Sequence, residues 1–159
     1  MRGEVREWVG RVVAEYAPAA PVLDIGSLDV NGTCRDLLPS DGYIGMDMRL
    51  GTGVDLLADI LKPPKTLLER FNTVVCLETL EHVTEPWTAI DSIYRCLRHG
   101  GLFIGTWCFA YPIHGEPGDY WRCTPDGFRY LLEQAGFCEI RIETEGEGPR
   151  GVFAVARKA

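Results

Sequence analysis

The stretch that decides the fold reads Pro21-Val22-Leu23-Asp24-Ile25-Gly26-Ser27-Leu28-Asp29-Val30-Asn31-Gly32. A short apolar run closed by a glycine predicts a buried strand over residues 21–26, followed by a tight turn. Gly26 tolerates a positive φ and lets its backbone approach a ligand closely. Residues from about 32 to 38 have helical character, and the first N–H groups of such a helix would point back over the strand end. The stretch therefore predicts the nucleotide-binding turn of an open α/β sheet.

Composition limits the kinds of protein this chain can be. Its 159 residues predict a single domain over 1–159. The net charge of −7 argues against a protein that binds nucleic-acid backbones. No apolar run approaches the roughly 20 residues of a membrane span, and the N-terminus does not resemble a signal peptide. The six cysteines include no Cys-x-x-Cys pair, so we expect reduced thiols and a cytoplasmic protein. The oligomeric state stays open.

The rest of the chain alternates between strand and helix patterns. An N-terminal helix over 2–16 and a linker to residue 20 precede the core, 21–157. Further strands are predicted at 43–47, 54–57, 71–77, 102–107, 138–144 and 152–157. Helices are predicted at about 32–38, at 65–69, from an N-cap at Thr84 to a stop at His99, and from Thr124 to Ala135. No helix fits between the last two strands, so they should pair as an antiparallel hairpin. The fold class is α/β: one doubly wound, mostly parallel, seven-stranded sheet with helices on both faces and Rossmann-like connections.

Polar residues follow four of the predicted strands where each one ends. They are Asp24, Asp47, Asp59 and the segment from Glu78 to His82. Ligands of open α/β sheets bind beyond the carboxyl ends of the strands, near the point where the strand order reverses. The sequence therefore predicts one ligand site at this edge.

Five segments resemble the motifs of class I S-adenosylmethionine-dependent methyltransferases, in the group with the methyltransferase type 11 domain. They are Val22-Leu23-Asp24-Ile25-Gly26-Ser27, Tyr43-Ile44-Gly45-Met46-Asp47, Asp59-Ile60, Phe71-Asn72-Thr73-Val74-Val75-Cys76-Leu77-Glu78-Thr79-Leu80-Glu81-His82-Val83 and Leu97-Arg98-His99-Gly100-Gly101-Leu102. The resemblance spans residues 21–157 in the family's order. It departs from the family at Leu28 and Val30, which stand where the first motif usually has glycines.

The resemblance implies an enzyme that transfers the methyl group of S-adenosyl-L-methionine to a small-molecule acceptor, at oxygen or nitrogen. Asp47 would take the ribose hydroxyls, and Asp59-Ile60 would meet the adenine. The implied cofactor-binding residues are Asp24, Gly26, Ser27, Asp47, Met48, Asp59, Ile60, Leu77 and Glu78. No nucleic-acid or membrane partner is expected.

Several of these residues have simpler interpretations. Asp47 also fits a solvated turn, and Asp59 fits a helix N-cap. Asp24 ends a buried strand and needs donors, which are either the amides of the loop or the ammonium group of the cofactor. For Glu81 and His82, capping at the surface or fixing a loop is an alternative to a role in the site.

The loop over 108–123 is the candidate acceptor site, because it follows a strand at the same edge and is rich in aromatic and titratable groups. The predicted substrate-binding residues are Tyr111, His114, Tyr120, Trp121 and Arg122. His114 is the first candidate for a general base, with Asp119 or Glu116 behind it. The alternative is a structural loop pinned by an Asp119–Arg122 pair. Cys108, His114 and Cys123 match no zinc spacing, so no metal is predicted.

Two other functions fit parts of the pattern. A nicotinamide-dependent oxidoreductase shares the first turn and the acid at the end of the second strand, but it usually carries a further substrate domain. A protein that binds S-adenosylmethionine without transferring the methyl group fits the altered glycines. Cofactor binding separates the first alternative from a methyltransferase, and a turnover assay separates the second.

Overall fold

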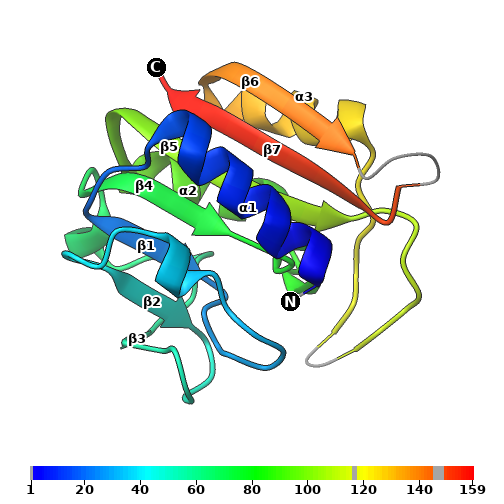
Figure 1. The fold of residues 1–159 in the computed structure, drawn as a ribbon, viewed down its shortest axis with the longest axis horizontal. Helices are drawn as coiled ribbons and strands as arrows, with labels where there is room; N and C mark the ends of the chain where they lie inside the picture. The colour runs from blue at the N-terminus through cyan, green and yellow to red at the C-terminus, as the bar shows by residue number, and fades with distance from the viewer. Residues whose placement is uncertain (1, 116–117, 145–148) are drawn as a thin grey trace.

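Seven strands form one sheet in the order β3-β2-β1-β4-β5-β7-β6 (Figure 1). The computed structural model describes residues 2–115, 118–144 and 149–159. The strands are β1 (Val22–Ile25), β2 (Ile44–Asp47), β3 (Leu56–Leu57), β4 (Phe71–Cys76), β5 (Leu97–Cys108), β6 (Phe137–Thr144) and β7 (Gly151–Lys158). The first five run parallel, whereas β7 is antiparallel to both β5 and β6. The predicted fold class, including the terminal hairpin, is confirmed.

Helices cover both faces of the sheet. The helix α1 (Gly3–Tyr16) crosses one face, and α2 (Pro86–Cys96) and α3 (Pro125–Ala135) lie on the other (Figure 1). The alternation of side chains along each strand divides the core between them. In β5, Leu102 and Ile104 pack in the cluster that contains α1, while Phe103 packs in the cluster that contains α2 and α3. Every central strand is therefore buried on both sides, as its continuous apolar sequence requires.

The predicted helix at 32–38 is wrong. The segment contains only a three-residue 3₁₀ helix, η1 (Arg35–Leu37). Gly32 has a φ of +100° and Pro39 follows η1 closely, so too few residues remain to offset the cost of nucleating an α-helix. The Arg6 side chain of α1 holds the segment instead, donating to the Thr33 carbonyl at 2.6 Å and to the Asp36 carboxylate at 2.8 Å.

Two other helices differ from prediction at their ends. The predicted helix at 65–69 is the short 3₁₀ helix η2 (Lys65–Leu67), and α2 begins at Pro86 with Glu85, not Thr84, at its N-cap. Thr124 is the N-cap of α3 as predicted, and its hydroxyl accepts from the Gly127 amide at 3.1 Å. In the described ranges, no helix combines the length and the apolar character that crossing a bilayer requires.

Candidate functional site

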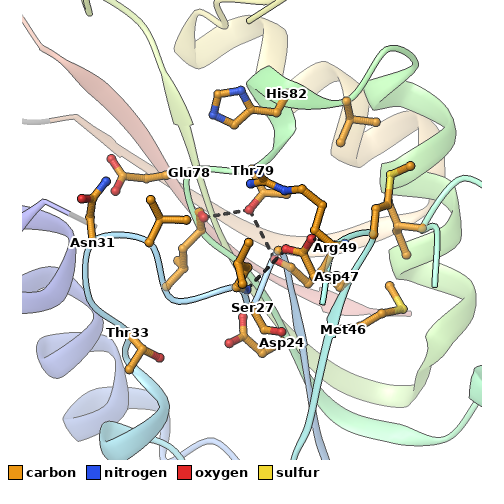
Figure 2. A pocket seen from close by; sticks show the side chains of 18 of the residues that line it. Asp24, Ser27, Asn31, Thr33, Met46, Asp47, Arg49, Glu78, Thr79 and His82 are labelled. Carbon is orange, nitrogen blue, oxygen red and sulfur yellow. Dashed lines mark hydrogen bonds between the residues drawn. The ribbon is translucent and has the colours of Figure 1, made fainter. Parts of the chain in front are cut away.

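A cavity of about 810 Å³ opens beyond the carboxyl ends of β1, β2 and β4 (Figure 2). This volume is in the range of small-molecule and cofactor sites. Ten residues predicted for cofactor or substrate line it: Asp24, Gly26, Ser27, Asp47, Met48, Ile60, Leu77, Glu78, Tyr111 and His114. The structure therefore brings residues from five separate segments to one space, at the edge where the sequence predicts a ligand.

The turn after β1 uses its own amides internally. Gly26 and Ser27 both donate to the Met46 carbonyl, at 2.9 and 3.2 Å, and Leu28 donates to Asp47 at 3.3 Å. Asp29 donates to the Thr52 carbonyl at 2.9 Å. Since no α-helix starts here, the expected set of free N–H groups pointing over the strand is not formed. The turn is a packed corner against β2, unlike the open amide cradle that binds phosphates.

Gly26 is required by close packing as well as by its backbone. Its φ is +77°, and an added Cβ would lie 2.1 Å from Oγ1 of Thr79. Thr79 follows β4 and donates its hydroxyl to the Leu77 carbonyl at 2.9 Å. The glycine thus lets two neighbouring strand ends meet at the cavity floor.

Two carboxylates stand at the ends of β1 and β2. Asp47 accepts from the Leu28 and Arg49 amides, at 3.3 and 2.8 Å, and its oxygens retain acceptor capacity toward the cavity. Asp24 accepts the Tyr43 hydroxyl at 2.7 Å. Burial raises the pKa of Asp24 to about 6, and the hydrogen bond from Tyr43 opposes that rise. The sequence predicts loop amides or the cofactor's ammonium group as donors to Asp24. In the structure the donor is the Tyr43 hydroxyl.

One end of the cavity is apolar. Met46, Met48, Ala58 and Ile60 line it, and Met46 and Ile60 are buried. Asp59 is not among the lining residues, and its carboxylate accepts from the Leu61 amide at 2.8 Å. No helix starts at Asp59, so the N-cap alternative is wrong, and the carboxylate instead accepts from a backbone donor two residues on, within its own turn.

The segment after β4 contributes Leu77, Glu78 and Thr79. Glu78 has a φ of +48°, a region that costs a non-glycine residue energy and that is found at functional sites. Its carboxylate pairs with the Arg2 side chain and accepts the Arg2 amide at 3.0 Å. Arg2 also lines the cavity, so the start of α1 closes this side.

The loop after β5 is built around one buried ion pair. The Asp119 side chain is only 2% exposed, and Arg122 binds it with two nitrogens, one at 2.6 Å. The Arg122 guanidinium holds the pKa of Asp119 well below its usual range. Arg122 also donates to the Tyr111 and Pro112 carbonyls, at 3.3 and 3.2 Å. The pair therefore folds the loop back on itself, as the structural alternative predicted.

Asp119 also orients His114. Its carboxylate accepts the His114 amide at 2.8 Å and lies 3.3 Å from Nδ1 of the ring. The Pro112 carbonyl lies 3.1 Å from the same nitrogen. With two acceptors beside it, Nδ1 is the protonated nitrogen, which leaves the lone pair on Nε2. His114 and Tyr111 then face the cavity from the loop.

Three predicted substrate residues lie away from the cavity wall. Arg122 makes its hydrogen bonds within the loop itself, to Asp119, Tyr111 and Pro112. Trp121 donates from Nε1 to the Thr84 carbonyl at 3.2 Å and packs on Trp87, with ring centroids 5.5 Å apart. Tyr120 is 54% exposed, and its amide donates to the Glu81 carbonyl at 2.8 Å. Neighbouring residues of a loop face in different directions because no repeat fixes their faces. Glu116 lies outside the described residues.

Some lining residues were missed or misjudged. Arg2 lines the cavity without having been predicted to do so, and Thr79 and Cys108 line it from two predicted segments in which they were not singled out. Thr79 stands inside the recognised motif, which was a usable signal, whereas nothing local links Arg2 to a site 76 positions away. The surface-capping alternative for Glu81 is wrong, because its side chain is fully buried, and that burial raises the pKa of the carboxyl group. His82 lines the cavity, and its Nδ1 lies in hydrogen-bond contact with the Gly118 carbonyl.

A comparison with protein families matches residues 36–105 to a methyltransferase domain model, Methyltransf_11. That range runs from η1 through most of β5 and includes the ends of β2 and β4. No sequence among the curated proteins matches the chain.

Solved structures extend the likeness to nearly the whole chain. The 1,6-didemethyltoxoflavin-N1-methyltransferase of Burkholderia thailandensis, solved with S-adenosylhomocysteine, is 18% identical; the match covers 99% of this chain and 79% of that one, with a TM-score of 0.75. The CurJ carbon methyltransferase is 17% identical over 97% of this chain and 54% of its own, with a TM-score of 0.75. The [4+2]-cyclase SpnF is 17% identical over 96% and 80%, with a TM-score of 0.72. At such identities the structures establish the fold alone. The family match lies inside that fold and covers 70 of the 159 residues, so the comparisons show the fold and a likeness to methyltransferases.

Proposed function

We propose that this protein is a methyltransferase, which holds S-adenosylmethionine in the cavity and transfers its methyl group to a small-molecule acceptor that enters beside Tyr111 and His114. The observation that carries the proposal is the chemistry of the β1–β2 corner. Its amides at Gly26, Ser27 and Leu28 are spent on β2, while the Asp47 carboxylate faces the same cavity. These three amides are therefore not free to bind a pyrophosphate, and the carboxylate offers an acceptor for hydroxyl and ammonium groups.

The lining residues fit this cofactor part by part. In this proposal Asp47 accepts the ribose hydroxyls. Met46, Met48 and Ile60 enclose the apolar end, which suits an adenine ring. Ser27 lines the cavity, and its buried Oγ has no hydrogen-bond partner among the described residues. An unpaired buried hydroxyl favours a polar ligand group nearby.

The same corner separates this cofactor from a nicotinamide dinucleotide. A dinucleotide places its pyrophosphate on free amides at a helix N-terminus. The segment that would form this helix contains only η1, and the carboxylate of Asp29 accepts the Gly32 amide at 2.8 Å in the turn. A negative side chain at this position would repel phosphate groups. The oxidoreductase alternative is thus disfavoured by the residues themselves.

When bound, S-adenosylmethionine supplies a methyl group on a positively charged sulfur, which keeps the electron pair when an acceptor nucleophile takes the methyl. The protein's task is to align the acceptor, since orientation alone supplies much of the rate. His114 offers its Nε2 lone pair at the acceptor side and can take the proton that an oxygen or nitrogen nucleophile loses. Asp119 keeps the ring oriented but is a weak base, because Arg122 lowers its pKa. The neighbours include N- and C-methyltransferases, and we propose oxygen or nitrogen here because a titratable ring faces the cavity.

The first experiment compares ligands by thermal denaturation of the purified chain. At a hundredfold excess over Kd, S-adenosylhomocysteine should stabilise the fold by about 2.7 kcal/mol. For a domain of this size we expect a rise in Tm of roughly 5–10 °C, and no rise with NAD. No shift at millimolar S-adenosylhomocysteine would contradict the proposal.

A turnover assay then decides between transfer and binding alone. A protein described as a cyclase, SpnF, has a similar fold, so neither the fold nor binding of the cofactor by itself establishes transfer. Formation of S-adenosylhomocysteine should be followed with panels of phenols, amines and enolisable carbon acceptors. A protein that binds the cofactor tightly but converts no member of a broad panel would support the binding-only alternative.

A further inference from the structure

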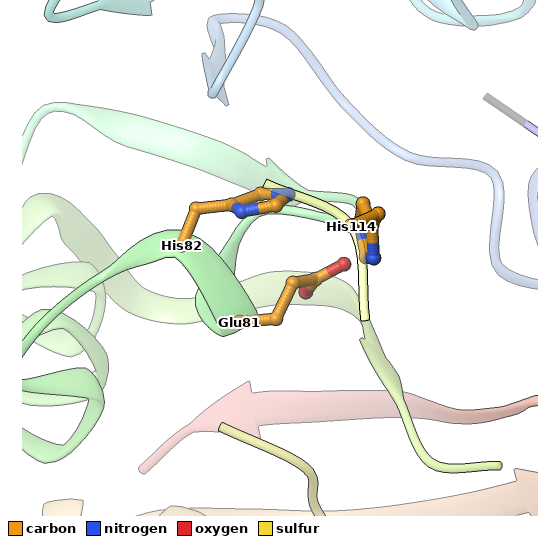
Figure 3. Close-up of side chains that lie close together, drawn as sticks. All are labelled: Glu81, His82 and His114. Atoms are coloured by element: carbon orange, nitrogen blue, oxygen red, sulfur yellow. The ribbon is translucent and has the colours of Figure 1, made fainter. Parts of the chain in front are cut away.

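Three side chains gather at the acceptor end of the cavity: Glu81, His82 and His114 (Figure 3). Each offers one potential ligand atom, and these atoms all lie within 4.8 Å of one another. Glu81 and His82 belong to the 3₁₀ helix η3 (Leu80–His82), whereas His114 comes from the loop after β5. Both histidines line the cavity, and their ring centroids are 5.0 Å apart.

Glu81 is unusual in its burial. Its side chain is 0% exposed, and the Cys108 thiol donates to Oε1 at 3.0 Å. Oε2 is buried and has no hydrogen-bond partner among the described residues. A buried carboxylate is costly unless hydrogen bonds or a cation compensate it. Figure 3 shows this carboxylate turned toward the two rings, where a cation would meet it.

The two imidazole rings are held from behind. The Nδ1 atom of His82 contacts the Gly118 carbonyl, and Nδ1 of His114 lies beside the Pro112 carbonyl and the Asp119 carboxylate. Oxygen acceptors at Nδ1 fix the ring orientation and leave a lone pair on Nε2. Histidines that bind metals are supported in this way, by outer carbonyl and carboxylate groups.

We propose that Glu81, His82 and His114 bind one divalent transition-metal ion of the zinc, iron or manganese type. Two imidazoles and one carboxylate suit such ions, while all-oxygen sets suit magnesium and calcium. Bonds of about 2.0–2.2 Å place ligand atoms roughly 3–4 Å apart, so the three side chains need only a small inward movement. Three protein ligands leave a coordination position open, and the two cavity-lining histidines direct it toward the acceptor end.

This inference rests on the proposed function for its role in the reaction. An acceptor oxygen bound to the ion loses its proton to solvent more readily than a free hydroxyl. His114 then serves as a ligand, and deprotonation no longer requires it as the base. The substrate class becomes narrower: acceptors with a hydroxyl or enol oxygen that can reach a metal.

The test uses Co²⁺ as the probe, with the purified full chain stripped of metal by a chelator. The visible absorption of bound Co²⁺ reports coordination without any substrate. We expect one ion per chain, with affinity lowered about tenfold to hundredfold or more in His82→Gln and His114→Gln, since even outer groups contribute this much. His99→Gln is the matched control: His99 is the one histidine of the sequence outside the cluster, it is exposed, and we expect its replacement to leave binding unchanged.

Glu81→Gln removes the charge of the third ligand while keeping its shape, and it should abolish the Co²⁺ spectrum. If that variant does not fold, the two histidine variants decide the question. Absence of Co²⁺ binding, or binding that both histidine variants leave intact, would overturn the proposal. The Tm rise with S-adenosylhomocysteine is measured on the metal-free protein. A rise in Tm with S-adenosylhomocysteine but no Co²⁺ binding therefore refutes only this inference. Co²⁺ binding with no rise in Tm refutes only the proposed cofactor site.

Discussion

The two halves of the cavity are built in different ways. The half proposed for the cofactor, called the cofactor half below, lies on the ends of β1, β2 and β4, which are joined by backbone hydrogen bonds and by the close packing of Gly26 against Thr79. The acceptor half depends on one loop, which a single ion pair between Asp119 and Arg122 folds back on itself. The first half is fixed by the register of the sheet. The second is fixed by a few side chains, so it can change its lining without disturbing the strands.

The largest effect is expected where the strands meet. Gly26→Ala should destabilise the fold by about 2–4 kcal/mol, because it forces a Cβ into Thr79 at a positive φ. Gly32→Ala is the control, since Gly32 also has a positive φ but nothing within 4 Å of an added Cβ. It should cost only about 1 kcal/mol. Urea unfolding of the two variants gives both values, and equal losses would show that packing against Thr79 contributes little.

The ion pair of the loop should give the next largest effect. Asp119→Ala and Arg122→Ala should each lower stability by about 2–3 kcal/mol, because each leaves a partly buried charge without its partner. The double variant should be no worse than either single one. Since the pKa of Asp119 is lowered, its contribution is present above the usual carboxyl pKa and is lost as the pH falls below about 4.

A thermal-melt double-mutant cycle measures this coupling without any substrate. The comparison between the halves predicts that S-adenosylhomocysteine affinity stays nearly intact in all three variants. Additive losses in stability would mean that Asp119 and Arg122 act separately, and a large loss of affinity would mean that the loop belongs to the cofactor half.

Asp47→Ala tests the cofactor half directly. It should weaken S-adenosylhomocysteine binding by about 1.5–3 kcal/mol, the value of hydrogen bonds to a charged group. Stability without ligand should change little, because among the described residues the side chain accepts from two turn amides, one partly buried at Leu28 and one exposed at Arg49. Asp59→Ala is the matched control, because the Asp59 carboxylate is bound within its own turn and does not line the cavity. Calorimetric titration measures the S-adenosylhomocysteine affinity of both variants. Equal affinities would mean that Asp47 serves only to hold its turn.

The smallest effect concerns Asp24. Its pKa of about 6 lies above the value near 3.9 in an unfolded chain, so the folded state binds more protons between these values. Stability should therefore fall as the pH rises from about 4 to 6 and stay at the lower level above that. Asp24→Asn should remove this fall and stabilise the protein at pH 7 by about 1–2 kcal/mol, while weakening S-adenosylhomocysteine. Melting curves across pH 4–8 check it, and an unchanged pH profile would show that Asp24 is not the titrating group.

Sequence reasoning was most successful where a regular element positions the residue. Asp47 ends a short apolar strand, so its place at the edge of the sheet follows from the sequence pattern. The helix predicted at 32–38 was wrong because its composition favours a helix, but Gly32 and Pro39 leave too few residues between them to offset the cost of helix nucleation. The prediction that Tyr120 and Trp121 bind substrate was not supported, because a loop has no regular backbone repeat from which the direction of a side chain can be predicted. The burial of Glu81 depends on Cys108, which comes from a different strand, and no local signal in the sequence reports such a contact.

The pairing of Arg2 with Glu78 has a practical consequence for work with this protein. The amide and the side chain of Arg2 both contact Glu78, a residue of the cavity wall, so a peptide joined ahead of Arg2 would be attached beside the cavity. An affinity tag at that end would compete for the space of the cofactor or lend its own histidines to a bound ion. The terminus after β7 lies at the opposite edge of the sheet (Figure 1), so a tag placed there keeps the assays independent of the purification handle.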